Sequence, residues 1–436
     1  MRAMTVLETT TPRNMPRAAA VGSMMGTTIE WYDFYIYATA SALVFNSVFF
    51  TNISPTAGTL AAFSTYTAGF VARPLGAVIS GHLGDRIGRK AVLVGALLLM
   101  GATTTAIGLL PTYEQIGLLA PTALALLRLL QGLAVGAEWG GAALLSMEHA
   151  PPNRRGLYSS FTQLGSPAGM LLATGVFYAV RSSAGEEAFL AWAWRIPFLL
   201  SIGLVVLGLV VRLKLVDAAG FRELKERGEI ARFPVLEVLR SQPRNVLLTI
   251  GLRLSQIALF VLLTTYSLTY LETNFEQGDQ AGLVAVMVSS ALGLCTTPLW
   301  AHLSDRFGRK PAYLFGAIGG PLVLALFFLA VETGSELAVV LAIVVGVNVV
   351  HDAMYGPQAA WFGELFDTRV RYSGVSLGYQ IGAVLSGGLA PLIAAVLLVV
   401  GGGSPWLILV YFLVLTGFTV ASARAAAETH RNEEVR

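Results

Sequence analysis

The stretch GHLGDRIGRK at residues 81–90 recurs as AHLSDRFGRK at residues 301–310, with seven of ten positions identical. The copies are offset by 220 residues, so they divide the 436-residue chain into two related halves. A weaker echo pairs EHAPPNRRG at 148–156 with ELFDTRVRYSG at 364–374, where a Glu precedes two arginines in both copies. Repetition of this kind indicates two parallel copies of one structural unit with a site between them.

Apolar residues dominate the chain. Hydrophobic residues make up 55% and charged residues 13% of it, and the mean hydropathy is +0.67. Because a soluble globular domain carries about 25% charged residues, the composition predicts a polytopic membrane protein. The single cysteine, Cys295, excludes an internal disulfide framework. A net charge of only +3 gives no reason to expect a nucleic-acid partner.

Long apolar runs predict the membrane spans. Runs of about 20 apolar residues, the length of a bilayer-spanning helix, occur at 19–45, 59–80, 91–110, 121–146, 156–180, 191–213, 246–271, 281–300, 312–331, 337–362, 373–400 and 404–424. We therefore expect an all-α membrane protein whose twelve transmembrane helices form two six-helix bundles. The predicted parts are an N-terminal tail (1–18), a first bundle (19–213), a linker (214–245) with a short amphipathic helix in FRELKERGEIARF, a second bundle (246–424) and a C-terminal tail (425–436).

The positive charges predict the orientation. If the N-terminus is cytoplasmic, the tails and the loops after even-numbered spans hold 24 of the 29 Lys and Arg residues, and the outward loops hold two. Cytoplasmic loops of membrane proteins carry such an excess. Both termini are thus expected in the cytoplasm, with the chain in the cell (inner or plasma) membrane. The remaining three arginines, Arg73, Arg128 and Arg253, lie inside spans.

Several long motifs resemble one family of transporters. The repeated loop is similar to the cytoplasmic signature of the major facilitator superfamily. Four segments resemble its metabolite:proton symporter family: IEWYDFYIY (29–37), GFVARPLGAVISGHLGDRIGRK (69–90), RLLQGLAVGAEWGGA (128–142) and RYSGVSLGYQIGAVLSGG (371–388). LVFN (43–46), GTLAAF (58–63) and NVVHD (348–352) resemble shikimate transporters most. One departure is Ala137, where the family usually has Gly.

The resemblance implies alternating access and proton-coupled uptake of a small solute, driven by the proton gradient without a cofactor. Family members carry organic acids or zwitterionic osmolytes. A shikimate-like hydroxylated monocarboxylate is our first expectation, and a dicarboxylate or an oxo-acid the second. The alternatives are betaine or proline symport, proton-independent facilitation and, in another class, a membrane solute sensor. We expect a monomer in the lipid bilayer and not an enzyme, because the sequence has no metal-ligand cluster, nucleophile elbow or phosphate loop.

Two carboxylates three residues apart, Glu30 and Asp33, share one face of the first span. Ionisable groups inside a membrane are costly and therefore candidate functional residues. At 1.5 Å of rise per residue, Asp33 and Arg128 lie at about the same depth, whereas Glu30 has no arginine at its level. Proton-coupled sugar porters of the superfamily have such an Asp–Arg pair. We predict that Asp33 carries the proton, that Arg128 is its partner and that Glu30 biases the pair; the alternative is a permanent salt bridge.

Arg253 is the leading candidate for binding a substrate carboxylate, since a guanidinium can grip it with two hydrogen bonds. Its depth equals that of Asp352, so a structural pair with Asp352 is the alternative. His351 could relay protons, because its unperturbed pKa is about 6.5, or bind substrate, or only pack. Further candidate substrate-binding residues are neutral and polar: Tyr37, Gln163, Gln256, Tyr266, Tyr355, Gln358, Tyr379 and Gln380. Arg73 is predicted to form a structural pair with Glu138.

The charged residues of the repeated loop lie too close to the membrane surface to reach a substrate at mid-membrane. They are Asp85, Arg86 and Arg89 in the first copy and Asp305, Arg306 and Arg309 in the second. Their expected partners are Glu148 and Glu364 at neighbouring span ends. We predict a latch that closes the cytoplasmic side, because a few kcal/mol is enough to bias a two-state equilibrium. The alternative is that these charges only set the topology.

Overall fold

The computed structural model describes residues 15–87, 89–136, 144, 146–147, 150–214, 234–274, 278–367 and 370–430. This part of the chain is almost entirely helical and contains no β-strand. The main helices of its first half are α1 (Met15–Leu43), α3 (Pro55–Ile87), α4 (Arg89–Leu109), α6 (Leu119–Val135), α8 (Arg155–Gln163), α9 (Gly165–Ala184) and α11 (Ile196–Lys214). Short helices join them: α2 (Phe45–Phe49), α5 (Tyr113–Ile116), η1 (Pro152–Arg154), α10 (Glu186–Ala191) and η2 (Ala193–Arg195).

The second half begins with α13 (Pro234–Ser241) and then contains longer helical rods. They are α14 (Pro243–Val261) with η3 (Leu262–Tyr266) and α15 (Ser267–Asn274), α16 (Gly278–Phe307), α17 (Arg309–Glu332), α18 (Glu336–Val345) with η4 (Gly346–His351) and α19 (Asp352–Glu364), α20 (Arg371–Gly382) with η5 (Ala383–Gly388) and α21 (Ala390–Val400), and α22 (Trp406–Ala425). The predicted amphipathic helix at 221–233 lies outside the described residues, and the domain boundaries stay predictions.

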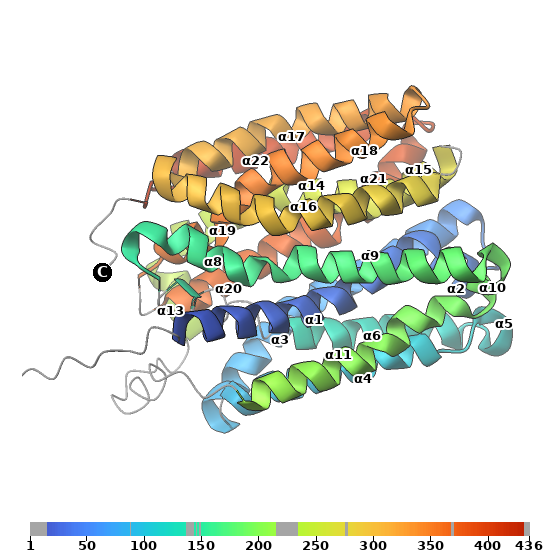
Figure 1. Ribbon diagram of the computed structural model, residues 1–436, viewed down its shortest axis with the longest axis horizontal. Coiled ribbons are helices and arrows are strands. Elements are labelled where there is room, and N and C mark those ends of the chain that lie inside the picture. The colour runs from blue at the N-terminus through green and yellow to red at the C-terminus, as the bar shows by residue number, and fades with distance from the viewer. Residues whose placement is uncertain are drawn as a thin grey trace, which may run out of the picture.

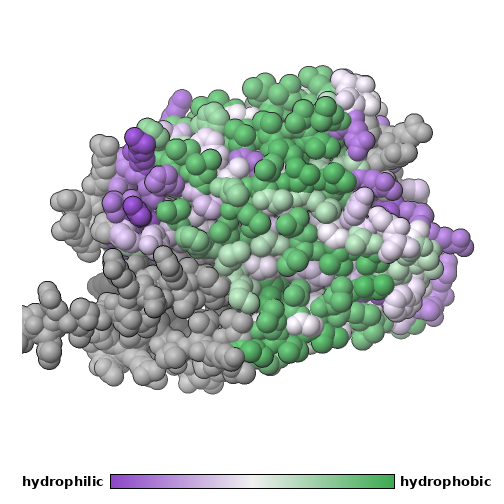
Figure 2. Space-filling view, in the orientation of Figure 1, coloured by the Kyte–Doolittle hydropathy of each residue, from purple (hydrophilic) through white to green (hydrophobic). Residues whose placement is uncertain are grey.

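Seven helices of the described part are long and apolar enough to cross a membrane. They are Ala193–Val210, Pro243–Asn274, Gln280–Phe307, Arg309–Glu332, Glu336–Glu364, Arg371–Val400 and Trp406–Ala425, and they coincide with the last seven predicted spans. The other predicted spans fall on α1, α3, α4, α6 and the α8–α9 pair. Hydrophobic residues cover the middle of the visible face, and hydrophilic residues gather at its two ends (Figure 2). Such a large exposed apolar surface is expected of a protein surrounded by lipid.

The helices pack mainly within each half of the chain (Figure 1). In the first half, α1 packs on α9 and α11, and α6 packs on α3 and α4. In the second, α14 packs on α20 and α22, and α16 packs on α18 and α19. The halves meet where α16 contacts α8 and α9, and where η5 and α21 contact α3. A site between the halves is therefore bounded mainly by α3, α8 and α9 on one side and by α16, α19, α20 and η5 on the other.

Three helical rods of the second half contain a π-helical turn: η3, η4 and η5. Such turns change the direction of the side chains that follow and occur frequently at functional sites. η4 ends at His351, directly before Asp352. At the end of η5, a Cβ atom on Gly388 would lie only 2.6 Å from Cβ of Phe70, so glycine permits the close contact between the halves.

Candidate functional site

Arg253 lies on α14 and is 1% exposed. Its Nη1 donates hydrogen bonds of 2.5 Å to Oε1 of Gln256 and to Oε1 of Gln358, and its guanidinium lies 3.8 Å from the centre of the Tyr379 ring. Cation–π contact of this kind is favourable. Among the described residues, Nε of Arg253 has no hydrogen-bond partner. Neutral amides and an aromatic ring thus hold this buried cation.

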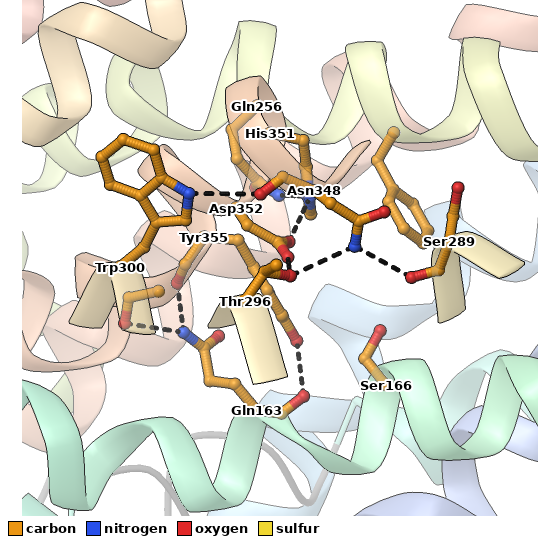
Figure 3. A network of polar contacts seen from close by, with 12 residues as sticks. Gln163, Ser166, Gln256, Ser289, Thr296, Trp300, Asn348, His351, Asp352 and Tyr355 are labelled. Carbon is orange, nitrogen blue, oxygen red and sulfur yellow. Dashed lines mark hydrogen bonds and ion pairs between the residues drawn. The ribbon is translucent and has the colours of Figure 1, made fainter. Parts of the chain in front are cut away.

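A chain of polar contacts continues from Gln256 to α16 (Figure 3). Nε2 of Gln256 lies 2.5 Å from Nε2 of His351, and Nδ1 of His351 lies 3.0 Å from Oδ1 of Asp352. Thr296 donates a hydrogen bond of 2.5 Å to Oδ2 of Asp352. The alternative of a direct Arg253–Asp352 pair is therefore wrong for this conformation. Depth places the two residues at one level, but an amide and an imidazole fill the space between them.

Asn348 and Thr296 extend this network, and neither was predicted. Nδ2 of Asn348 donates to Oγ1 of Thr296 at 3.1 Å and to the Ser289 carbonyl at 2.9 Å. Nε1 of Trp300 donates to the Asn348 carbonyl at 3.1 Å (Figure 3). The NVVHD motif contains one signal for this role, because Asn348 precedes Asp352 by four residues and can share its helix face.

A cavity of about 20 Å³ adjoins the Asp352 end of the network and is lined by both halves of the chain. Ser166 and Met170 of α9 line it on one side, and His351, Asp352 and Tyr355 line it on the other. A water molecule needs roughly 10–15 Å³ of such volume and two to four polar partners. The cavity therefore has room for water beside the His351–Asp352 pair.

The other predicted substrate-binding residues occupy different positions relative to this network. Tyr355 stacks on His351 with 5.2 Å between ring centres. Gln163 of α8 donates to the Tyr355 carbonyl, so it joins the two halves at the edge of the network (Figure 3). Tyr266 and Gln380 are buried, but in the described part of the chain the Tyr266 hydroxyl and Oε1 of Gln380 have no hydrogen-bond partner.

Asp33, on α1, is fully buried, and neither carboxylate oxygen meets a hydrogen-bond partner within the described ranges. The structure contains no ion pair between Asp33 and Arg128, although both are described. Instead, Nη1 of Arg128 donates to Oε1 of Gln131 at 2.6 Å, and its guanidinium lies 4.0 Å from the centre of the Tyr37 ring. The alternative of a permanent Asp33–Arg128 salt bridge is therefore wrong, and the roles of Asp33 as proton carrier and of Arg128 as its partner stay predictions. The aromatic ring and the Gln131 amide hold the arginine away from the acid.

The hydrogen-bond chain from Arg128 runs through Gln131 to Thr104, and both Arg128 and Thr104 interact electrostatically with the Asp33 carboxylate. Nε2 of Gln131 donates to the Thr104 hydroxyl at 2.7 Å, and that hydroxyl donates to the Met100 carbonyl at 2.9 Å. The pairs Arg128–Gln131 and Arg253–Gln256 have the same spacing of three residues and the same Arg-to-Gln bond. The first chain ends on a backbone carbonyl, whereas the second ends on a carboxylate.

Arg73 lies 4.2 Å from the ring centre of Phe70 and 4.9 Å from that of Phe34. Glu30 interacts with it electrostatically. Glu30 thus has an arginine partner that the comparison of depths along the spans did not identify. The predicted partner of Arg73, Glu138, lies outside the described residues. Tyr37 donates to the Thr65 hydroxyl at 2.7 Å besides its contact with Arg128.

The two halves carry opposite charges at one equivalent position. At the 220-residue offset of the repeated loop, Asp33 of α1 corresponds to Arg253 of α14. Both side chains are at least 99% buried, and the helices that carry them approach each other at the rings of Tyr35 and Phe260, whose centres lie 6.0 Å apart. The arrangement therefore places a candidate proton site in the first half and a candidate anion site in the second.

At one end of the helices, Arg309 forms a buried charge cluster. It lies 3.1 Å from Oε1 of Glu364 and 2.7 Å from Oδ1 of Asp305. Both carboxylate oxygens of Asp305 also accept hydrogen bonds of 2.8 Å across the two halves, from the backbone N–H groups of Gly156 and Leu157 at the start of α8. We call Asp305, Arg309 and Glu364 the latch cluster. Its function as a latch stays a prediction.

Arg306 does not belong to this cluster: it is exposed and lies 5.4 Å from the centre of the Phe307 ring. The structure does not describe the side chains of the residues expected to form the corresponding cluster in the first copy of the loop. They are the side chains of Asp85, Arg86 and Arg89, and the whole of Glu148.

The C-terminal tail covers the latch cluster, which the sequence did not predict. Glu428 accepts hydrogen bonds of 2.9 Å from the backbone N–H groups of Arg309 and Lys310, where a carboxylate also complements the helix dipole of α17. Burial alone would raise the pKa of Glu428, but these two hydrogen bonds, a third of 3.4 Å from the backbone N–H of His430 and the nearby His430 side chain together hold the pKa below its ordinary value. Thr429 donates to Oε2 of Glu364 at 2.5 Å. The tail thus fixes both α17 and α19.

Residues 23–391 match the Major Facilitator Superfamily. The chain belongs to this superfamily. It is 42% identical over 399 residues to the "Shikimate transporter" of Escherichia coli (strain K12), an alignment that covers 91% of each protein. It is 33% identical to the "Glycine betaine/proline/ectoine/pipecolic acid transporter OusA" of Dickeya dadantii (strain 3937), over 87% of this chain and 77% of that protein.

Solved structures of the superfamily have the same fold. The xylose transporter XylE from E. coli, in a partially occluded inward-open conformation, matches with a TM-score of 0.73 and 18% identity over 96% of this chain and 99% of that one. A crystal structure of the D-xylose-proton symporter matches with a TM-score of 0.69, also at 18% identity. This Major Facilitator Superfamily protein is therefore an all-α, multi-pass membrane transporter and not an enzyme.

Proposed function

We propose that this transporter is a proton-coupled symporter that takes up a small organic anion. Hydroxylated monocarboxylates such as shikimate are the first candidates, and dicarboxylates and oxo-acids are the second. The 42% identity to a protein named as a shikimate transporter supports the first class. A zwitterionic osmolyte is the alternative substrate, because another relative is named as a transporter of glycine betaine and proline.

The observation that carries the proposal is the environment of Arg253. The guanidinium is buried and is held by neutral amides, and His351 and Gln256 separate it from the nearest carboxylate of its own network. A buried charge without a direct counter-ion is costly. An entering carboxylate would neutralise the guanidinium and could bind its fork with two hydrogen bonds. Gln358 and Tyr379 surround the same position and are suited to contact the rest of the substrate.

Asp33 supplies the proton site in this proposal. An ionised carboxylate without hydrogen bonds would cost several kcal/mol at a buried position. Asp33 is therefore expected to carry a proton in this conformation. If the bundles move and Arg128 leaves Gln131 for Asp33, the ion pair would favour the ionised acid and release the proton. The proposal has both termini in the cytoplasm, where the latch cluster would close the inward side.

Uptake into proteoliposomes tests the proposal. Labelled shikimate, 2-oxoglutarate, citrate and proline betaine are offered with and without an inward proton gradient. We expect shikimate to accumulate only with the gradient, and Arg253→Met to abolish that accumulation. Arg306→Gln is the matched control, because it removes an exposed arginine. Equal shikimate uptake with and without the gradient would contradict proton coupling. If none of the labelled carboxylates is transported, the proposed substrate class is wrong.

A further inference from the structure

The polar chain from Arg253 to Asp352 has a direction that its donors determine. A guanidinium only donates hydrogen bonds, so the atom of Gln256 that it contacts must be the amide oxygen. The other end of that amide is then the NH₂ group, which also only donates. Nε2 of His351, 2.5 Å away, must therefore accept. The imidazole is thus neutral, and its single proton lies on Nδ1, facing Asp352 at 3.0 Å.

We propose that Gln256 couples anion binding at Arg253 to protonation of His351, so that His351 and Asp352 form a second proton-binding site. This inference rests on the proposed function, since it requires the substrate anion at Arg253. A carboxylate at Arg253 competes for the Nη1 hydrogens that Oε1 of Gln256 accepts. Without that donor, the Gln256 amide can turn over and present its oxygen to Nε2 of His351. Nε2 then has to donate, so a proton from water binds there and both ring nitrogens are protonated.

The charge balance favours the same step. In the state described, the positive Arg253 and the negative Asp352 balance each other at the two ends of a neutral chain. An anion at Arg253 neutralises that end and leaves the Asp352 carboxylate without a counter-charge. Because unbalanced charges are costly at buried positions, a proton on His351 restores neutrality. Within the described helices, the only other hydrogen bond that holds the Gln256 amide is the longer one of 3.2 Å from Gln358.

Among the described residues around His351, Asp352 is the only carboxylate, and Arg253, which reaches it through Gln256, is the only permanent cation. The other neighbours are neutral: Gln256 and Phe260 of α14, Ser289, Ser290, Thr296 and Thr297 of α16, Tyr355 of α19, and Ser166 and Met170 of α9. Tyr35 of α1, which contacts Ser166, and Tyr313 of α17, which reaches Gln256 through Gln358, lie further away and are also neutral. The water-sized cavity beside His351 and Asp352 lies between the halves and has room for a water molecule next to the imidazole.

Nitrogen-15 NMR of the full chain in proteoliposomes, with labelled histidine, tests the inference. The His351 signals are assigned as those that His351→Gln removes. Without ligand near neutral pH, we expect a neutral ring with the proton on Nδ1. Saturating shikimate should protonate both nitrogens. In Gln256→Leu, His351 should stay neutral even when the shikimate concentration is raised until the variant is saturated, whereas Gln131→Leu, which alters the equivalent Arg–Gln pair of the first half, should leave the His351 response intact.

A ligand-free variant separates this inference from the proposed substrate. Arg253→Met removes the donor that orients Gln256, so His351 should be protonated on both nitrogens without any ligand at the pH where the parent ring is neutral. The measured proton-to-shikimate ratio should fall by about one in His351→Gln, as expected when one titrating site is lost. The inference would be overturned if Nε2 of His351 carries a proton in the parent protein without shikimate, or if the His351 signals of Arg253→Met are the same as those of the parent. Absence of shikimate binding to the parent protein would instead count against the proposed substrate.

Discussion

Replacing Asp305 by Asn should open the latch end of the molecule. Asp305 of α16 accepts two hydrogen bonds of 2.8 Å from the backbone N–H groups of Gly156 and Leu157 in the opposite half. It also contacts Arg309, but that residue belongs to the same half. The contacts with α8 are therefore the part of the cluster that has to break when the two halves separate.

The structure gives the size of the expected effect. Hydrogen bonds to a charged group contribute about 1.5–3 kcal/mol each. The introduced asparagine would keep one neutral acceptor for one of the two N–H groups, so Asp305→Asn loses about one charge-assisted bond. A loss of about 2 kcal/mol lowers the ratio of closed to open molecules roughly 30-fold, since 1.4 kcal/mol corresponds to a factor of ten.

Labelling of a buried cysteine measures this ratio. Ser159 of α8 is 0% exposed, follows Gly156 by one helical turn, and its hydroxyl has no hydrogen-bond partner among the described residues. In a Cys295→Ser background, maleimide should therefore label Ser159→Cys only when the halves separate. We expect labelling about 30-fold faster with Asp305→Asn.

Arg306→Gln provides the control for this experiment, because it changes one charge of the same helix at an exposed position. That variant should label at the parent rate. If Asp305→Asn also labels at the parent rate while its thermal stability is unchanged, the contact with α8 does not hold the halves together, and the reasoning fails.

Three further predictions concern other contacts. Arg253→Lys should raise the KM for shikimate uptake about 10- to 100-fold, because lysine cannot replace the fork and loses a charged hydrogen bond; an unchanged KM would exclude Arg253 from the site. Glu428→Gln should cost about 1 kcal/mol of stability near neutral pH through the lost helix cap. Because the pKa of Glu428 lies below its ordinary value of 4.5, this stabilisation is complete at neutral pH and is lost as the pH falls through the folded-state pKa. Melting temperatures of variant and parent should therefore converge below pH 4.5, and a constant difference would contradict the cap. Gly388→Ala should destabilise the fold by about 1–3 kcal/mol by overpacking against Phe70, whereas Gly417→Ala, which meets no atom within 4 Å, should not; equal melting temperatures would refute the close contact.

The fold could be predicted because its signals are long and redundant. A 220-residue repeat and apolar runs of membrane-spanning length do not depend on any single side chain. The seven helices that meet the length and composition criteria coincide with predicted spans. The π turn that ends at His351 could not be predicted, because its insertion into a helix leaves no apolar period of its own.

The charged pairs were harder to predict, because helix depth locates a residue along the membrane normal but not across it. Arg253 and Asp352 are in one network as expected, yet two neutral side chains separate them. Arg128 has the depth of Asp33, but its guanidinium lies over an aromatic ring. The Glu428 contact was missed for another reason: a polar tail after the last span gives no sign that it folds back onto α17.

Transport by Asp33→Asn tests the central claim most directly. Asparagine has the shape of the protonated acid but cannot release a proton. In proteoliposomes, we predict that this variant loses accumulation of shikimate driven by the proton gradient and keeps exchange of preloaded shikimate. Gradient-driven accumulation at the parent level, or loss of both activities in a variant that is inserted normally, would contradict the claim that Asp33 carries the coupling proton.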